Sequence, residues 1–395
     1  MRRSTSVVPL ALTCIAVGMR AAGLFGGQMA TADRLQGPGW WPTKATASRK
    51  DFVGAKTCAQ CHAAQSATQP TTAMARTAMR AHDSTVLREH SRLATTEGSY
   101  SYEITTDDQG SMYTVTSGSG RSSAPLTWAF GVGNVGQSFL FERDGVFHEA
   151  RVSYYDAIGS LDITPGRRLD APRDVDQAMS RRVTTTEVRR CFGCHMTAPI
   201  AEGVLDTAAA TPGITCEACH GPGREHVDAM KQRHMAEGRK AILNPAKLAP
   251  ADSVDFCGAC HATFWDVTLA NEKGIAAMRS QPYRLSSSRC WDASDARITC
   301  VACHQPHRPL VRDLAAYDAR CLACHKSTAS EPTQNLSRRS SPVIQGAEAD
   351  HPGRACRIST ARCAGCHMPK YDVPDLHHSS TDHLIRIVRN SDRRN

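Results

Sequence analysis

The sequence predicts a loop-rich fold, mainly helical and irregular, with a small antiparallel β insert. Three observations lead to this prediction. The pentad Cys-x-x-Cys-His occurs seven times and takes 14 of the 17 cysteines. Bulky side chains are scarce, because aromatic residues make up only 6% of the chain. Alternating polar and apolar residues, which are typical of strands, are concentrated in residues 97–160.

Every Cys-x-x-Cys pair is followed by a histidine, and this pattern indicates covalently attached haem c. Two thiols at this spacing can each add to one vinyl group of a haem, and the histidine then reaches the iron from one face. Zinc knuckles need facing pairs but no histidine after each pair. A thioredoxin-like dithiol needs one motif beside a βαβ unit. Neither alternative explains seven histidines in the same position.

The sequence therefore predicts seven haems c, each with its iron held by a proximal histidine, and the porphyrins would supply much of the core. The attachment residues, in chain order from the first motif to the seventh, are Cys58, Cys61 and His62; Cys191, Cys194 and His195; Cys216, Cys219 and His220; Cys257, Cys260 and His261; Cys300, Cys303 and His304; Cys321, Cys324 and His325; and Cys363, Cys366 and His367.

The N-terminus reads as a secretory signal peptide over residues 1–32. Arg2 and Arg3 precede a short apolar stretch, and Ala-Thr-Ala at 30–32 is a small-x-small cleavage site. A retained anchor is the alternative. Export agrees with haem c, which is attached outside the cytoplasm, so we expect a periplasmic or extracellular protein. Residues 33–50 are expected to form a linker.

The remaining chain divides by the spacing of the motifs. Residues 51–96 hold the first motif, and residues 97–160 form the β-rich insert, with a hairpin turn expected at Asp144-Gly145. Residues 161–395 form a C-terminal region with six motifs, short helices and a long polar loop at 327–355. Cys290 and Cys356 are spare, and the sequence leaves open whether they form a disulfide.

Ten further histidines are enough to ligate every iron from the opposite side. His226 and His307 follow the third and fifth motifs so closely that the chain cannot pass round the haem just before them, so each is expected to ligate a neighbouring haem. A hydrogen bond to a propionate is the alternative. In LHHSSTDHLIRI (376–387), His383 and one of His377 and His378 are further distal candidates. For the other histidines an ordinary surface or core role is favoured; they are His82, His90, His148, His234 and His351.

The formal charge of +9 could suggest a nucleic-acid partner. Seven haems would bring 14 propionates, however, and arginine pairs well with carboxylates. We therefore expect the basic excess to serve the cofactors and expect no nucleic-acid partner. A solvated basic surface is the alternative.

With these motifs, the chain resembles exported multihaem c-type cytochromes related to the tetrahaem cytochrome of ammonia oxidisers. The resemblance covers most of residues 50–390. Besides the motifs, it rests on phrases such as GITCEACHGPGREHV (213–227), ITCVACHQPH (298–307) and TDHLIRI (381–387). It implies an exported electron carrier with closely packed, mostly bis-His haems. Relatives often carry a histidine in the stretch matching GVGNVGQSFL (131–140), and this chain has none there.

The sequence is compatible with three functions. The leading one is a non-catalytic carrier that passes electrons between a redox donor and an acceptor outside the cytoplasm, with an association with a membrane complex left open. The second is an oxidoreductase acting on small nitrogen or sulfur compounds at one five-coordinate haem, although no Cys-x-x-Cys-Lys motif occurs. The third is a subunit of a cytochrome filament or an outer-membrane conduit.

Overall fold

The structure is a computed structural model that describes residues 47–168, 171–269, 271, 275–325, 356 and 359–388. The predicted signal peptide, most of the linker at 33–50, the loop at 327–355 and His351 lie outside these residues. Among the described residues, Cys290 forms no disulfide. In the described part of the chain, the helices lack the length and apolar character needed to cross a bilayer.

The first part of the fold is built from antiparallel sheets. A four-stranded sheet has the order β2-β3-β4-β5, and a seven-stranded sheet has the order β1-β6-β7-β8-β11, with β9 joined to β7 and β10 to β9. Helices α5 (Thr85–Glu89) and α6 (Val175–Met179) lie in the same part. The strands are β1 (Ala78–Arg80), β2 (Arg92–Glu97), β3 (Tyr100–Asp107), β4 (Gly110–Ser117), β5 (Gly120–Pro125), β6 (Trp128–Phe130), β7 (Gly136–Arg143), β8 (Val146–Ala150), β9 (Val152–Tyr155), β10 (Ser160–Ile163) and β11 (Ser180–Arg182).

The strands extend on both sides of the predicted insert at 97–160. The outlying strands β1, β10 and β11 have three or four residues each, too few to show alternation in the sequence. The predicted hairpin is confirmed, because Arg143 pairs with Val146 around a two-residue turn. Asp144 and Gly145 both have positive φ, 53° and 72°, as a type I′ turn requires. The chain around this turn forms three consecutive strands, β7, β8 and β9.

An apolar core holds the two sheets together. Tyr102 and Ile104 of β3 and Phe139 and Phe141 of β7 are fully buried in the same cluster. These residues alternate along their strands, so each strand turns one face to the core. Both apolar clusters found among the described residues lie between residues 78 and 210.

The second part of the fold consists of short helices and loops that carry the seven motifs. The stretch 223–242 contains two helices with a break at Arg233, where φ is 62°. The helices are α3 (Ala55–Ala59), α4 (Ala63–Thr68), α7 (Thr185–His195), α8 (Cys216–His220), α9 (Arg224–Lys231), α10 (Met235–Lys240), α11 (Pro250–His261), α12 (Phe264–Leu269), α13 (Ile275–Met278), α14 (Gln281–Ser286), α15 (Cys300–Cys303), α16 (Asp318–Leu322) and α17 (Cys363–His367).

Small antiparallel pairs complete the fold. Strand β12 (Met196–Thr197) pairs with β15 (Thr211–Pro212), and β13 (Ile200–Ala201) pairs with β14 (Val204–Leu205). Near the C-terminus, β16 (Lys370–Val373) and β17 (His378–Thr381) form a further hairpin.

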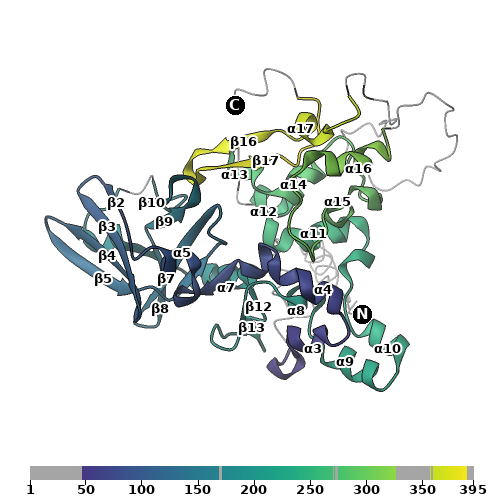
Figure 1. The fold of residues 1–395 in the computed structure, drawn as a ribbon, viewed down its shortest axis with the longest axis horizontal. Coiled ribbons are helices and arrows are strands. Elements are labelled where there is room, and N and C mark those ends of the chain that lie inside the picture. The colour runs from purple at the N-terminus through teal and green to yellow at the C-terminus, as the bar shows by residue number, and fades with distance from the viewer. Residues whose placement is uncertain are drawn as a thin grey trace, which may run out of the picture.

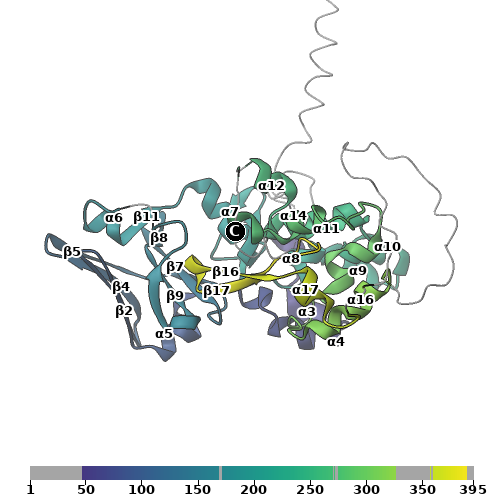
Figure 2. The same cartoon turned by 90° about the horizontal axis from the view of Figure 1, so that it is seen from above.

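The two parts lie side by side, with the sheets at one end of the molecule and the helices at the other (Figure 1). The β16–β17 hairpin runs from α17 across to the sheets, as the second view also shows (Figure 2). At its tip, His377 Nε2 lies 2.7 Å from a carboxylate oxygen of Asp162 in β10. Asp375 forms an ion pair of 3.3 Å with Arg168. The hairpin therefore joins the last motif to the β part.

Candidate haem-attachment sites

Local helical structure presents the thiols of the motifs. The second and fourth motifs end α7 and α11, and the third and seventh form the whole of α8 and α17. Cysteines three residues apart are neighbours on one face of a helix, so their thiols can approach the same edge of a ligand. None of the fourteen motif cysteines forms a disulfide in the structure.

Helix α7 shows how the surrounding sequence supports a motif. Thr184 and Glu187 form a reciprocal capping box at its start, and Arg181 donates to Glu187 at 2.6 Å. The bonds from the backbone and side chain of Thr184 lower the pKa of Glu187 to about 2. Inside the motif, Phe192 is fully buried and packs edge-on against Trp128 of β6 at 5.2 Å. The second motif is thus anchored to the β part.

Backbone carbonyls orient three of the proximal histidines. His195 Nδ1 lies 3.1 Å from the carbonyl oxygen of Thr77, and His220 Nδ1 lies 2.7 Å from that of Leu243. His367 Nδ1 is 2.8 Å from the carbonyl oxygen of Arg386. A carbonyl only accepts, so Nδ1 must carry the proton. The lone pair of Nε2 is then left for a metal.

Three of the predicted distal histidines face a proximal histidine from another motif. The ring centroids of His62 and His226 are 6.3 Å apart, with the rings inclined at 25°. Those of His220 and His307 are 6.0 Å apart at 6°, and those of His304 and His383 are 6.2 Å apart at 46°. Two imidazoles bound to opposite sides of one iron, each through a nitrogen about 2 Å away, have centroids about 6 Å apart. The pairs therefore fit bis-His ligation.

The protonation of these histidines suits the same role. Burial lowers the pKa of His195, His304, His307 and His383. The imidazoles are then neutral near pH 7, which is the form that binds iron. The neutral tautomer with Nδ1 protonated also fits His383, whose Nδ1 is 3.1 Å from the carbonyl oxygen of Thr381.

His378, the fourth distal candidate, has a different setting. It lies on β17, where its side chain is largely exposed. Partial burial is the main cause that lowers its pKa, and the positive charges of Arg312 and Lys370 add to the effect. Within the described residues, no proximal imidazole faces it, and His377 beside it is held by Asp162. His195, His261 and His367 likewise have no facing imidazole in the part of the chain that the structure describes.

Contacts between thiols bring the motifs into neighbouring positions. The thiol of Cys58 interacts with that of Cys216 and lowers the pKa of Cys216 to about 7. Similar contacts join the second motif to the fourth, the fourth to the fifth and the sixth to the seventh. The thiol pairs are Cys194 and Cys260, Cys257 and Cys300, and Cys321 and Cys363. At longer range, the third motif lies near the fourth and the fifth near the sixth.

The sequence did not reveal a buried carboxylate that connects the first and third motifs. Glu217, at a variable position of the third motif, is buried and accepts backbone N–H bonds from Val53, Gly54 and Gly223 at 2.8, 2.8 and 2.9 Å. The first two donors precede the first motif, so one carboxylate joins two attachment sites. The only trace of this role in the sequence is an acidic residue between the two cysteines of a motif.

The motif residues fit haem c rather than a bare metal ion. Among the described residues, no group of three or more His, Cys, Asp or Glu side chains could hold a metal ion by itself. The paired thiols and the facing imidazoles instead suit a flat group lying between two rings. Bound there, haem would supply one-electron chemistry at its iron.

Part of the chain that carries the motifs is similar to known cytochromes. Residues 164–221, which include the second and third motifs, match the family described as cytochrome c554 and c-prime. The multiheme cytochrome MtrA of Shewanella baltica (strain OS185) is 22% identical over 213 residues. The two matches support a multihaem c-type cytochrome.

Neither match extends over the whole protein. The likeness to MtrA covers 52% of this chain and 49% of that protein, so the chain spans about half the length of the curated relative it matches. Among solved structures, the outer cell wall cytochrome OcwA is similar with a TM-score of 0.49 and 13% sequence identity. That likeness covers 87% of this chain and 81% of OcwA.

Proposed function

We propose that the protein is a heptahaem carrier that transfers electrons outside the cytoplasm, between a redox donor and an acceptor protein. The observation that carries the proposal is the set of three imidazole pairs about 6 Å apart, each formed by a proximal histidine and a histidine that follows a different motif. His62 and His226, His220 and His307, and His304 and His383 would ligate haems 1, 3 and 5. The remaining four motifs would attach haems 2, 4, 6 and 7.

The placement of the motifs supports a continuous path for electrons. A thiol marks the edge at which its haem is attached, so interacting thiols put two haems next to each other. The contacts run from the first motif to the third, and on through the fourth, fifth, sixth and seventh, with the second joining at the fourth. In this arrangement the chain sets the spacing, the axial ligands and the burial of each haem, and hence its potential.

A location outside the cytoplasm agrees with the predicted haem c, which is attached there. The predicted signal peptide points the same way. A role in a membrane-associated conduit or in a cytochrome filament belongs to the same proposal, since each would use the same row of haems.

A second candidate function is favoured by the setting of three histidines. His195, His261 and His367 have no facing imidazole among the described residues. One of these haems could then be five-coordinate and act as an oxidoreductase on a small nitrogen or sulfur compound. Phe130, whose ring centroid is 5.1 Å from that of His195 with the two rings nearly perpendicular, is the aromatic neighbour of one such site.

Two measurements on protein matured in a host that attaches haem c test these functions. Intact mass should exceed that of the processed polypeptide by seven haems, and a smaller number would contradict the heptahaem carrier. Low-temperature EPR of the oxidised protein should show low-spin haems. A high-spin ferric fraction that shifts on addition of nitrite or hydroxylamine would instead support the oxidoreductase.

A further inference from the structure

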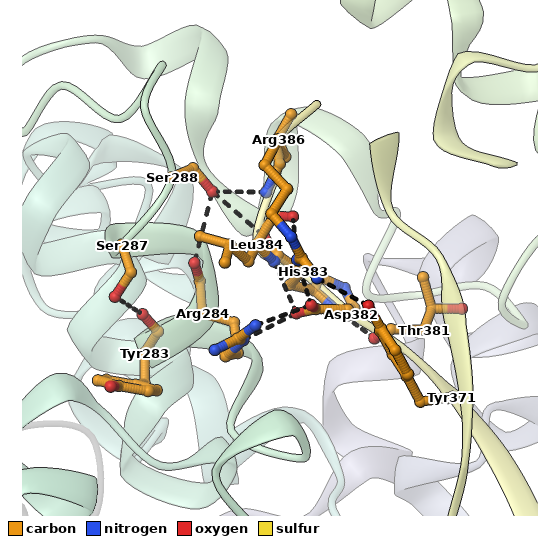
Figure 3. Close-up of polar contacts among 11 residues, drawn as sticks. Tyr283, Arg284, Ser287, Ser288, Tyr371, Thr381, Asp382, His383, Leu384 and Arg386 are labelled. Carbon is orange, nitrogen blue, oxygen red and sulfur yellow. Dashed lines mark hydrogen bonds and ion pairs between the residues drawn. The ribbon is translucent and has the colours of Figure 1, made fainter. Parts of the chain in front are cut away.

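A buried carboxylate lies beside the candidate distal ligand of haem 5 (Figure 3). Asp382 is fully buried and accepts two bonds from Arg284, from Nε and Nη2, each at 2.8 Å. Arg386 Nη1 donates to the same carboxylate at 2.6 Å, and Arg386 Nη2 donates to the hydroxyl of Tyr371 at 2.7 Å. We call Asp382, Arg284, Arg386 and Tyr371 the Asp382 cluster.

The cluster connects segments that are far apart in the sequence. Arg284 belongs to α14, Tyr371 to β16, and Asp382 and Arg386 to the segment after β17. A buried carboxylate between two guanidinium groups is costly to disrupt, because removing one partner leaves an unpaired charge. The bidentate geometry also fixes direction as well as distance. The segment 381–386 is therefore held rigidly against α14.

This segment carries groups that orient two irons. His383, next to Asp382, faces His304 of the fifth motif. The carbonyl oxygen of Arg386 lies 2.8 Å from His367 Nδ1 of the seventh motif. Ser288, just after α14, accepts a bond from the backbone N–H of Ile385 at 2.9 Å and donates to the carbonyl oxygen of His383 at 3.3 Å.

We propose that the Asp382 cluster is a positioning device that keeps His383 on the iron of haem 5 and the Arg386 carbonyl on His367. Asp382, Arg284 and Arg386 do not touch the haem iron; they act through the backbone between residues 381 and 386. The inference rests on the proposed function, because it presumes haems at the fifth and seventh motifs.

The test compares the spin state of the haems in variants of the holoprotein. Asp382→Asn keeps the size of the side chain and removes its charge, so both arginines lose their anchor. We expect one haem of the seven to become partly high-spin in EPR, with a signal that matches that of His383→Ala. Asp372→Asn is the matched control, because this exposed carboxylate lies on the same hairpin and accepts a bond from Ser379. The haems of this control variant should all stay low-spin.

A double variant separates positioning from a simple effect of charge. Asp382→Asn with Arg284→Gln restores the net charge of the cluster but not its bonds. A positioning role predicts that the high-spin fraction persists in the double variant. Recovery of the wild-type spectrum would mean that charge alone matters and would overturn the proposal.

Two further variants, Tyr371→Phe and His383→Ala, also test the positioning role. Tyr371→Phe leaves every charge in place and removes one hydrogen-bond partner of Arg386, so it serves if Asp382→Asn does not mature. A smaller high-spin fraction is then expected, and a fully low-spin spectrum contradicts the inference. A fully low-spin His383→Ala would contradict it too. If the proposed function itself is wrong, wild-type protein will lack the mass of seven haems. Intact mass therefore distinguishes that failure from a failure of the positioning role.

Discussion

At the residue scale, the most informative observation is that the histidines facing His62, His220 and His304 each follow a motif other than the one they face. His226 follows the third motif but faces His62 of the first, and His307 follows the fifth but faces His220 of the third. With haems bound as proposed, each such histidine would join two attachment sites through one iron. Loss of one side chain should therefore affect a defined haem.

Replacing His226 with alanine should leave the iron at the first motif with one protein ligand. We expect one haem to change from low-spin to high-spin while the others keep their spectra, as measured by EPR of the oxidised protein. His82→Ala is the control, because His82 is exposed and lies beside Asp83 at 3.4 Å. Equal spectra for the two variants would rule out His226 as a ligand.

Glu217 offers a second test at this scale. Its carboxylate accepts three backbone N–H groups, and each buried donor left unpaired costs about 1–3 kcal/mol. Glu217→Ala should thus lower the free energy of unfolding by about 3 kcal/mol or more, measured by denaturant titration of the holoprotein. Glu225→Ala on the exposed side of α9 should change it by less than about 0.5 kcal/mol. Similar values for both would refute the bridging role of Glu217.

At the element scale, α7 is the helix whose own sequence best explains its start. The capping box of Thr184 and Glu187 satisfies backbone groups that would otherwise be unpaired at the N-terminus. The helix ends with the second motif, so its stability and the placement of His195 depend on each other. Removal of the cap should weaken this helix first.

Thr184→Ala should destabilise the protein by about 1 kcal/mol at pH 7. For Glu187 the effect depends on pH, because its pKa falls from 4.5 to about 2 in the folded protein. A lowered pKa stabilises the fold above pH 4.5, and this contribution is lost as the pH falls toward 2. The difference in stability between wild type and Glu187→Gln should shrink over that range in denaturant titrations. A difference that stays constant between pH 7 and pH 2 would contradict this role of Glu187.

At the scale of the whole molecule, the two parts differ in what holds them together. The β part has a packed apolar core, with residues such as Tyr102 and Phe139 fully buried. Among the described residues, the apolar clusters stop at residue 210, and the later motifs are held by polar contacts such as the Asp382 cluster. We infer that attached haems complete the interior of the helical part, because apolar burial is the main driving force for folding.

Chain produced without haem attachment should therefore retain structure unevenly. In hydrogen–deuterium exchange, the strands between residues 92 and 163 should stay protected, whereas α8 to α17 should exchange rapidly. The holoprotein, measured in parallel, should be protected in both parts. Equal protection of the helices with and without haem would contradict an interior completed by the cofactor.

What the sequence determined by itself is local. The spacing of Cys-x-x-Cys-His predicts each attachment site, and Asp144-Gly145 predicts a hairpin turn, because each depends on a few adjacent residues. Strands of three residues, such as β1, could not be predicted, since only pairing with a distant strand stabilises them.

Only the tertiary structure decided which histidine faces which motif. His62 and His226 are separated by a long stretch of sequence, and Glu217 and the Asp382 cluster hold the segments that carry such ligands in place. The segment 376–387 has three histidines of similar promise, yet His383 faces His304 whereas His378 is exposed on β17. That choice depends on strand register and on buried charges contributed by α14. Both arise from contacts between distant residues, which the local pattern does not encode.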